Sequence, residues 1–410
     1  MFKGQRIFTS KRTLATFCII FLLAVGTLYD IVNYIQFVDK YIYFSIFALL
    51  HVLLIFVTAR EKVSDVKLSR FSIWAAFSLS LGITTLANSY ILIRSWLFFM
   101  PLMLLVWFVL IPAIKFELAD VLFILKSIVL LGMIYCFANL VINYDILFSF
   151  WNTADAYKNN CQGVYFNKNY WGQSLMPFVT VNVIVLLLAQ KNKYLWWVTL
   201  VILLYNIVAS LSRAAILAVC IFFVLMAFFI FIRSNTLTLK KTLIFLSCIV
   251  VIFLSLMGSS QLQSLWHNYF FRTHDVLTFR DTLWRIAWYY SKGMPFWGYG
   301  FGSQLHLIEA YGVKLGAFHN TYIDLFMQGG IVHLLVNLAI FGSSFFAAYR
   351  LYISNLRLGA VLLSALFAFC LYCNVEYVDL YSFSMPNILF CIIFLALPMI
   401  LLQITHEQNS

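Results

Sequence analysis

A histidine–asparagine pair opens one of the apolar segments of this chain, in the stretch FHNTYIDLFMQGGIVHLLVNLAIF of residues 318–341. Histidine is the side chain whose charge changes near neutral pH, so His319 could accept or donate a proton there. Asparagine is a preferred N-cap, so Asn320 could equally begin a helix. Taken alone, the local sequence is explained better by a capped helix start than by proton chemistry.

The composition indicates which elements must position this pair. Of the 410 residues, 63% are hydrophobic and 10% are charged, whereas a soluble domain has about 25% charged residues. Apolar stretches of about 20 residues, the length that crosses a bilayer core, recur along the whole chain. We therefore predict an all-α, polytopic transmembrane protein that forms a single integral membrane domain over residues 1–410, with about twelve spans at 14–33, 41–59, 72–91, 95–114, 121–143, 171–189, 194–211, 214–232, 241–258, 321–348, 358–373 and 386–404.

The positions of lysine and arginine predict how these spans are oriented. Sixteen of the 27 basic residues fall in the tail before the first span and in every second short loop after it. Because cytoplasmic loops carry an excess of basic residues, this distribution predicts that both termini are cytoplasmic. The net charge of +12 is then mostly a consequence of topology, and no nucleic-acid partner is needed to explain it.

Ten further basic residues fall on the opposite, outer side, where topology does not require them. They gather in the loop 144–170, at the outer end of the seventh and eighth spans, and in a long loop at 259–318. Positive charge concentrated on one face attracts anionic ligands. We predict an anionic ligand at the outer face, bound by members of this set: Lys40, Arg94, Lys158, Lys168, Arg213, Arg272, Arg280, Arg285, Lys292 and Lys314.

The loop at 259–318 is expected to carry function, since long connections without a role are uncommon in compact proteins. Apolar residues recur at helical spacing after Arg280, which predicts an amphipathic helix of about three turns that ends near Lys292. The GYGFG sequence at 298–302 predicts a turn in which the backbone can approach a ligand closely.

Four short motifs occur in an order that resembles the O-antigen ligase and polysaccharide polymerase superfamily. They are the NKN segment within GVYFNKNYWGQSL (163–175), the SR pair within SLSRAAIL (210–217), the RDTLW and PFWGYGFG segments between 280 and 302, and the HN pair followed by a span that contains GG. Each motif is weak alone, but their order and sidedness are specific. The resemblance covers residues 163–341, and it covers the N-terminal third only by topology.

This resemblance implies a GT-C-like membrane glycosyltransferase in the bacterial inner membrane, with its active site facing the periplasm. Members of the superfamily transfer a glycan from undecaprenyl diphosphate to an acceptor hydroxyl, by a transfer that we expect to be inverting. The matching residues are Arg213 and Arg280, which would hold the diphosphate, and His319, which would take the acceptor proton. Further substrate contacts are expected at Lys168, Asn169, Asn320 and Arg285.

Helix geometry places Arg285 apart from Arg280. It stands about 140° around the helix from Arg280, which favours a side chain that faces solvent or lipid headgroups. We expect it to contact substrate only if it takes the place of Arg280.

The sequence is compatible with three functions. The NKN and GYGFG motifs favour the polymerase branch, which joins repeat units of O antigen, capsule or exopolysaccharide, with a chain-length regulator as an optional partner. The alternative is the ligase branch, which joins the polymer to lipid A–core and tends to have a small or aromatic residue where this chain has His333. The second alternative is a lipid-linked sugar flippase, although transporters usually place charged residues near the bilayer midplane, where this chain has almost none.

A polar residue within a span should face protein, so His333 is expected to contact a neighbouring helix.

We expect no metal or cofactor in the reaction, because the histidines of the long loop share no metal-ligand spacing with carboxylates. Glycan transfer by the purified protein should therefore be unchanged after treatment with EDTA, measured as consumption of the lipid-linked donor. A loss of activity that Mg²⁺ or Mn²⁺ restores would contradict this mechanism.

Overall fold

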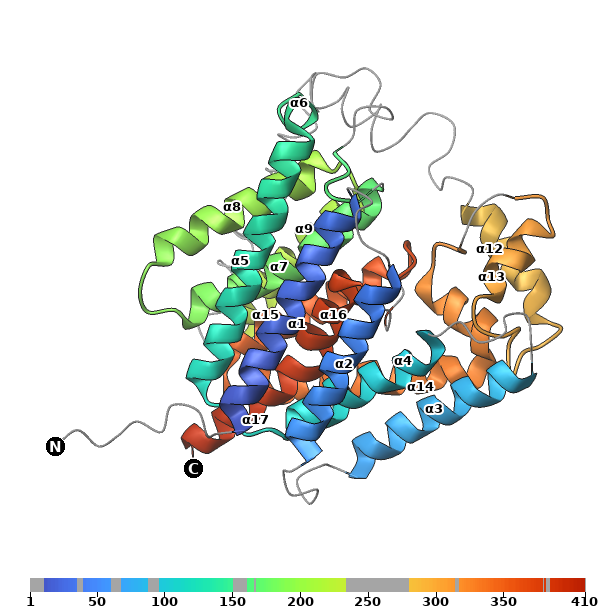
Figure 1. The fold of residues 1–410 in the computed structure, drawn as a ribbon, viewed down its shortest axis with the longest axis horizontal. Helices are drawn as coiled ribbons and strands as arrows, with labels where there is room; N and C mark the ends of the chain where they lie inside the picture. The colour runs from blue at the N-terminus through green and yellow to red at the C-terminus, as the bar shows by residue number, and fades with distance from the viewer. Residues whose placement is uncertain are drawn as a thin grey trace.

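The computed structural model describes residues 11–34, 40–59, 68–87, 96–149, 161–165, 167–233, 280–313, 317–378, 380 and 384–409. Over these ranges the chain forms helices and turns and no β-strand (Figure 1). The prediction of an all-α polytopic membrane protein is confirmed.

Eleven of the predicted spans coincide with helical segments in the described part of the chain. Their bounds are α1 (Lys11–Tyr34), α2 (Lys40–Ala59), α3 (Leu68–Ala87), α4 (Trp96–Leu104) with a π turn (Leu105–Leu110) and a 3₁₀ turn (Ile111–Ala113), α5 (Leu118–Ile142), α7 (Lys168–Leu188), α8 (Lys193–Ala209), α9 (Arg213–Arg233), α14 (Thr321–Ser354), α15 (Leu356–Tyr372), and α16 (Met385–Phe390) with a π turn (Cys391–Ala396) and α17 (Leu397–Asn409). A short helix, α6 (Tyr144–Leu147), follows α5. The predicted span at 241–258 lies outside the described residues.

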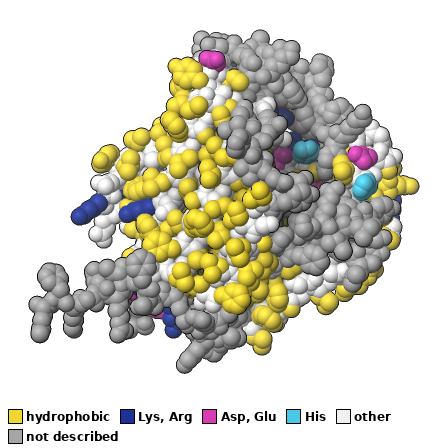
Figure 2. All heavy atoms as spheres, viewed as in Figure 1, with side chains coloured by type: hydrophobic (Ala, Val, Ile, Leu, Met, Phe, Trp, Pro, Cys, Tyr) yellow, Lys and Arg dark blue, Asp and Glu magenta, His cyan; other side chains and the backbone are white. Residues whose placement is uncertain are grey.

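Six helical stretches of the described chain are long and apolar enough to cross a membrane, and four more are apolar but shorter. The number of spans and the sides on which the termini lie therefore stay predictions. Large apolar side chains cover one flank of the bundle, as Figure 2 shows. Among the exposed apolar residues are Phe21, Leu49, Phe137 and Val201, each more than half exposed. An apolar surface of this extent is unfavourable in water and suits contact with lipid.

Polar contacts near the helix ends show that α1, α5, α9 and α14 share one end of the bundle. Arg12 of α1 lies 2.8 Å from Asp120 at the start of α5. Arg233 at the end of α9 donates to the carbonyl of Tyr352 near the end of α14. This is the end that the distribution of basic residues predicts to be cytoplasmic.

The opposite end of the bundle joins the end of α5 to the start of α7 and the start of α14 to the end of α15. Asn143 Nδ2 donates to Gly163 O at 3.0 Å, and Thr321 N donates to Cys373 O at 2.8 Å. Helix starts and helix ends thus alternate as the predicted topology requires. The candidate site lies at this end.

α14 is broken at Gly330, where a φ of 65° and a ψ of −166° interrupt the helix. The GYGFG segment at 298–302 packs into this break, and Gly300 N donates to Gln328 O at 2.9 Å. A Cβ on Gly330 would lie 2.1 Å from Phe296 O, so only glycine allows the two backbones to meet. The close backbone approach expected of GYGFG is therefore made to α14, inside the protein.

The described part of the 259–318 loop folds into two helices with a small core of their own. The predicted amphipathic helix is confirmed as α12 (Arg280–Ser291), and a second helix, α13 (Ser303–Glu309), was not predicted. Both pack on the first half of α14 (Figure 1). The buried residues of this core are Leu283, Ile286, Ala287, Leu307, Ile308, Phe318 and Met327.

Replacing Gly330 with alanine should destabilise the protein. The left-handed φ costs an L-residue about 1–2 kcal/mol, and the new Cβ would collide with the Phe296 carbonyl. We expect a loss of at least ~2 kcal/mol, measured as a lower thermal unfolding midpoint in detergent micelles. Gly342 of the same helix is the matched control, because a Cβ there meets no atom within 4 Å, and Gly342→Ala should be neutral or stabilising by up to ~1 kcal/mol. Equal effects of the two substitutions would contradict the close approach at Gly330.

Candidate active site

Glu376, in the segment that follows α15, is the centre of a buried polar cluster. Its Oε1 accepts hydrogen bonds from Arg280 Nη2 and from Asn169 Nδ2, the latter at 3.1 Å. Its Oε2 lies 3.2 Å from His319 Nδ1. These four residues, called here the Glu376 cluster, come from α7, α12, the start of α14 and the segment after α15. Figure 2 shows basic, acidic and histidine side chains gathered in a recess of the surface.

The backbone around Glu376 is fixed by the start of α14. Thr321 Oγ1 donates to Glu376 O at 3.0 Å and accepts from Val378 N at 3.0 Å. Asn320 Nδ2 donates to Asn374 O at 2.9 Å. Because the side chain of Glu376 is only 7% exposed, these contacts determine where its carboxylate can lie.

His319 has a left-handed backbone, with φ at 51°, a conformation that costs a non-glycine residue about 1–3 kcal/mol. Its neighbours hold it there. Phe318 is fully buried, and its carbonyl accepts from Trp284 Nε1 at 3.1 Å. Asn320 caps α14 by accepting hydrogen bonds from two backbone N–H groups of the first turn. The N-cap interpretation of Asn320 is thus confirmed, and the capped turn places the His319 ring against Glu376.

Contact with a carboxylate at Nδ1 determines which nitrogen of His319 can act as a base. The bond to Glu376 favours the tautomer with a proton on Nδ1, and this leaves the lone pair on Nε2. The His319 side chain is 31% exposed, so a ligand can reach it. The arrangement suits an imidazole that accepts a proton from a hydroxyl group.

The two arginines of α12 face different surroundings. Arg280 is 14% exposed at its side chain and pairs with Glu376. Arg285 is 77% exposed and pairs with Asp281 at 2.6 Å. The structure therefore brings Arg280 into the cluster and leaves Arg285 on the outer surface of the helix, as its angle around the helix favoured.

Lys168 and Arg213 begin two helices at the same end of the bundle. Lys168 is the first residue of α7, next to Asn169, and Arg213 is the first residue of α9. The two helix starts pack tightly, since a Cβ on Gly172 would lie 2.8 Å from Ala215 Cβ. Lys168 and Arg213 are half-buried. Their contact with substrate stays a prediction, as does that of Asn169 beyond its hydrogen bond to Glu376.

A buried carboxylate in α1 anchors the segment that precedes α7. Asp30 accepts hydrogen bonds from Tyr135 Oη at 2.6 Å and from Tyr165 Oη at 2.7 Å. Burial and the nearby Asp30 carboxylate raise the pKa of Tyr165 well above its usual value, so this phenol stays protonated and donates. The anchor holds the chain two residues before the NKN motif against α1 and α5.

Glu376 is the residue of the cluster that the sequence analysis missed. It stands in the segment NVEYVD, which has no helical periodicity and no motif of its own. The sequence did contain one indication of Glu376. The cations predicted at the outer face require a counter-charge, and this glutamate directly follows a predicted span at that face. No three His, Cys, Asp or Glu residues come together as a metal site in the described ranges.

His333 behaves as the sequence predicted for a polar residue within a span. It is 4% exposed, and its Nδ1 lies 3.0 Å from Ser80 Oγ of α3. Its side chain thus faces a neighbouring helix.

Residues 198–338 match the family described as O-antigen ligase. The matched region covers about a third of the chain. The match contains Arg213, Arg280 and His319, whereas Glu376 lies beyond its end. The resemblance to the superfamily of O-antigen ligases and polymerases is confirmed.

The match to the O-antigen ligase family supports a membrane glycosyltransferase and gives no support to the flippase alternative. It begins within α8 and ends in the second half of α14. Among curated proteins, none matches the chain at a significant level.

Neutralising Glu376 should destabilise the protein through Arg280. Glu376→Gln leaves a largely buried guanidinium without its counter-charge, which costs about 3 kcal/mol. We expect a lower midpoint of thermal unfolding, and we expect part of the loss to be recovered when Arg280→Gln is added. Asp281→Asn is the matched control, because it removes an exposed pair and should change stability by less than ~1 kcal/mol. Additive effects of Glu376→Gln and Arg280→Gln would show that the two side chains do not interact.

Proposed function

We propose that this protein transfers a glycan from undecaprenyl diphosphate to an acceptor hydroxyl at the periplasmic face of the inner membrane, and that it polymerises the repeat units of a surface polysaccharide. The observation that carries the proposal is that one buried carboxylate, Glu376, contacts both Arg280 and His319. An arginine suited to phosphate and a histidine suited to accept a proton are thereby held at one site.

His319 is the base of the proposed reaction. The acceptor hydroxyl gives its proton to His319 Nε2 while its oxygen attacks the anomeric carbon of the donor sugar. Glu376, on the other side of the ring, stabilises the imidazolium that forms. Attack from the side opposite the leaving group inverts the configuration at the anomeric carbon.

Arg280 and Arg213 stabilise the leaving group in this proposal. The bond between the anomeric carbon and the phosphate oxygen breaks, and the lipid diphosphate leaves with the electron pair. Charge grows on the diphosphate oxygens, where fixed cations are most effective. A guanidinium has five N–H donors, so the bond from Arg280 to Glu376 does not exhaust its capacity to bind phosphate. Lys168, at the start of α7, adds positive charge at the same end of the bundle.

Two observations bear on the choice between polymerase and ligase. The NKN and GYGFG motifs favour a polymerase, whose acceptor is a second lipid-linked glycan. The description of the matching family favours an O-antigen ligase, whose acceptor is lipid A–core. The ligase is therefore the second candidate function. The Glu376 cluster serves either acceptor, because both present a hydroxyl to His319.

The surface polysaccharide of a strain deleted for this gene distinguishes these functions. On a gel that resolves lipid A–core with zero, one or many repeat units, the proposal predicts lipid A–core that carries a single unit. Wild-type protein should restore long chains and His319→Ala should not. His306→Ala is the matched control, because this histidine lies exposed in the same loop and should restore wild-type chains.

Other outcomes of this experiment have defined meanings. Bare lipid A–core with long chains retained on the lipid carrier would establish the ligase and overturn the polymerase. Loss of a capsule or secreted polymer alone would support polymerisation of that product. An unchanged profile of every surface polymer would contradict the proposed function.

A further inference from the structure

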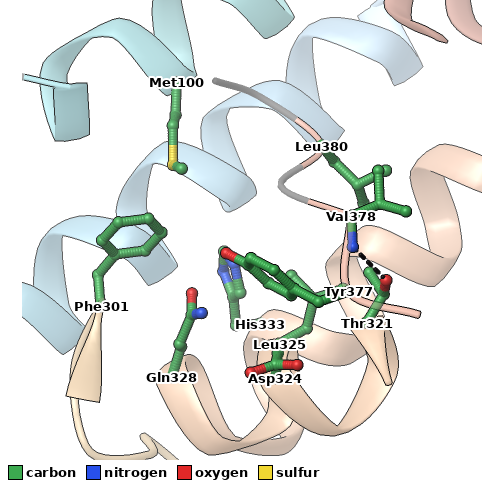
Figure 3. Close-up of a pocket in the computed structure, with 10 residues that line it drawn as sticks. All are labelled: Met100, Phe301, Thr321, Asp324, Leu325, Gln328, His333, Tyr377, Val378 and Leu380. Carbon is green, nitrogen blue, oxygen red and sulfur yellow. Dashed lines mark hydrogen bonds between the residues drawn. The ribbon is translucent and has the colours of Figure 1, made fainter. Parts of the chain in front are cut away.

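A small polar pocket lies next to the Glu376 cluster, between the first half of α14, the segment after α15, the GYGFG segment and α4 (Figure 3). The unfilled space in and around it is about 310 Å³, part of which opens to solvent. Most of this space is too narrow for a water-sized sphere. A single chemical group therefore fits the pocket without rearrangement, whereas a whole sugar ring does not.

The pocket shares its wall with the candidate active site. Thr321 and Val378, which line the pocket, form the hydrogen bonds that hold the backbone of Glu376. Thr321, Asp324 and Gln328 follow one another at helical spacing down the face of α14 that begins beside His319. A group in this pocket would thus belong to a molecule whose other atoms reach His319.

Besides Thr321, three buried polar side chains of α14 line the pocket. Asp324, Gln328 and His333 are 1%, 4% and 4% exposed. Figure 3 shows the amide of Gln328 directed into the pocket between Phe301 and His333. This amide forms no hydrogen bond with any other described residue. The amide is therefore available to donate to and accept from a group that enters the pocket.

The contacts of His333 leave one of its nitrogens as an acceptor. Ser80 Oγ donates its proton to Phe77 O at 2.8 Å. His333 Nδ1, 3.0 Å from the same oxygen, is therefore best described as the donor to it, and the lone pair of the ring lies on Nε2. The pocket thus offers acceptors at Asp324 and His333 and both a donor and an acceptor at Gln328.

Apolar side chains close the other side of the pocket. Met100 and Phe301 face Asp324 and Gln328 across it (Figure 3). An acylamino group has the matching chemistry, because its N–H needs an acceptor, its C=O needs a donor and its methyl group needs an apolar contact. A hydroxyl group would satisfy the polar wall and leave the apolar wall without contact.

We propose that this pocket binds an acylamino substituent of the sugar at the active site and so selects the glycan that is transferred. The proposal rests on the proposed function, and it makes Gln328 a specificity-determining residue. The sugar belongs to the donor or to the acceptor, and the same group chemistry serves both.

Binding of defined probes to the purified full-length protein tests this proposal. The donor probes are undecaprenyl diphosphate linked to N-acetylglucosamine or to glucose, and the acceptor probes are the octyl glycosides of the same sugars. We expect wild-type protein to bind the acetamido sugar about tenfold more tightly than the hydroxyl sugar in one pair. The pair that shows the preference identifies the donor or the acceptor as the source of the sugar. Gln328→Leu should abolish the preference.

A second readout separates binding from folding. Because the Gln328 amide lacks a partner, Gln328→Leu should leave the midpoint of thermal unfolding unchanged or higher. Gln403→Leu is the matched control, since Gln403 donates to Pro112 O at 2.8 Å at the other end of the bundle, and it should keep the preference. A buried glutamine with only a structural role would lower stability on substitution without changing the preference.

The possible failures are distinguishable. Equal binding of acetamido and hydroxyl sugars by wild-type protein, or a preference that survives Gln328→Leu, would overturn the pocket proposal and leave the proposed function intact. No binding of either undecaprenyl diphosphate probe would contradict the proposed function, and the pocket proposal would fall with it.

Discussion

The carboxylate of Glu376 is withdrawn from water at one end of a helical bundle, and removing such a charge from solvent costs several kcal/mol unless partners compensate it. Arg280, His319 and Asn169 supply that compensation from three separate elements. Since each partner depends on the same two oxygen atoms, a change in one alters the electrostatic environment of the others. The candidate active site is therefore one interdependent unit.

The fold around this unit is organised to keep its backbone fixed. Thr321 joins the start of α14 to the segment that carries Glu376, and Asn320 caps the helix directly after His319. The break at Gly330 receives the GYGFG segment, which links α12 and α13 to α14. These features hold a histidine in a strained conformation and an arginine of the outer loop against one glutamate.

Much of this arrangement can be predicted from the sequence. The features that were not predicted depend on contacts between residues that lie far apart in the chain. Hydropathy located the helices because lipid imposes a length and a composition on each span. The spacing of apolar residues located α12, and motif order located His319 and Arg280. The contact between Arg280 and Glu376 joins residues 96 positions apart, and no local pattern encodes such a contact. The break at Gly330 was also missed, because a GG pair in an apolar run is compatible with a continuous helix until its packing partner is known.

An experimental structure of the protein in lipid nanodiscs with bound undecaprenyl diphosphate tests the central claim most directly. The account predicts the diphosphate within hydrogen-bonding distance of the Arg280 guanidinium and beside Arg213, with Glu376 still in contact with His319. A diphosphate bound at another place, or a Glu376 side chain that contacts neither Arg280 nor His319, would contradict it.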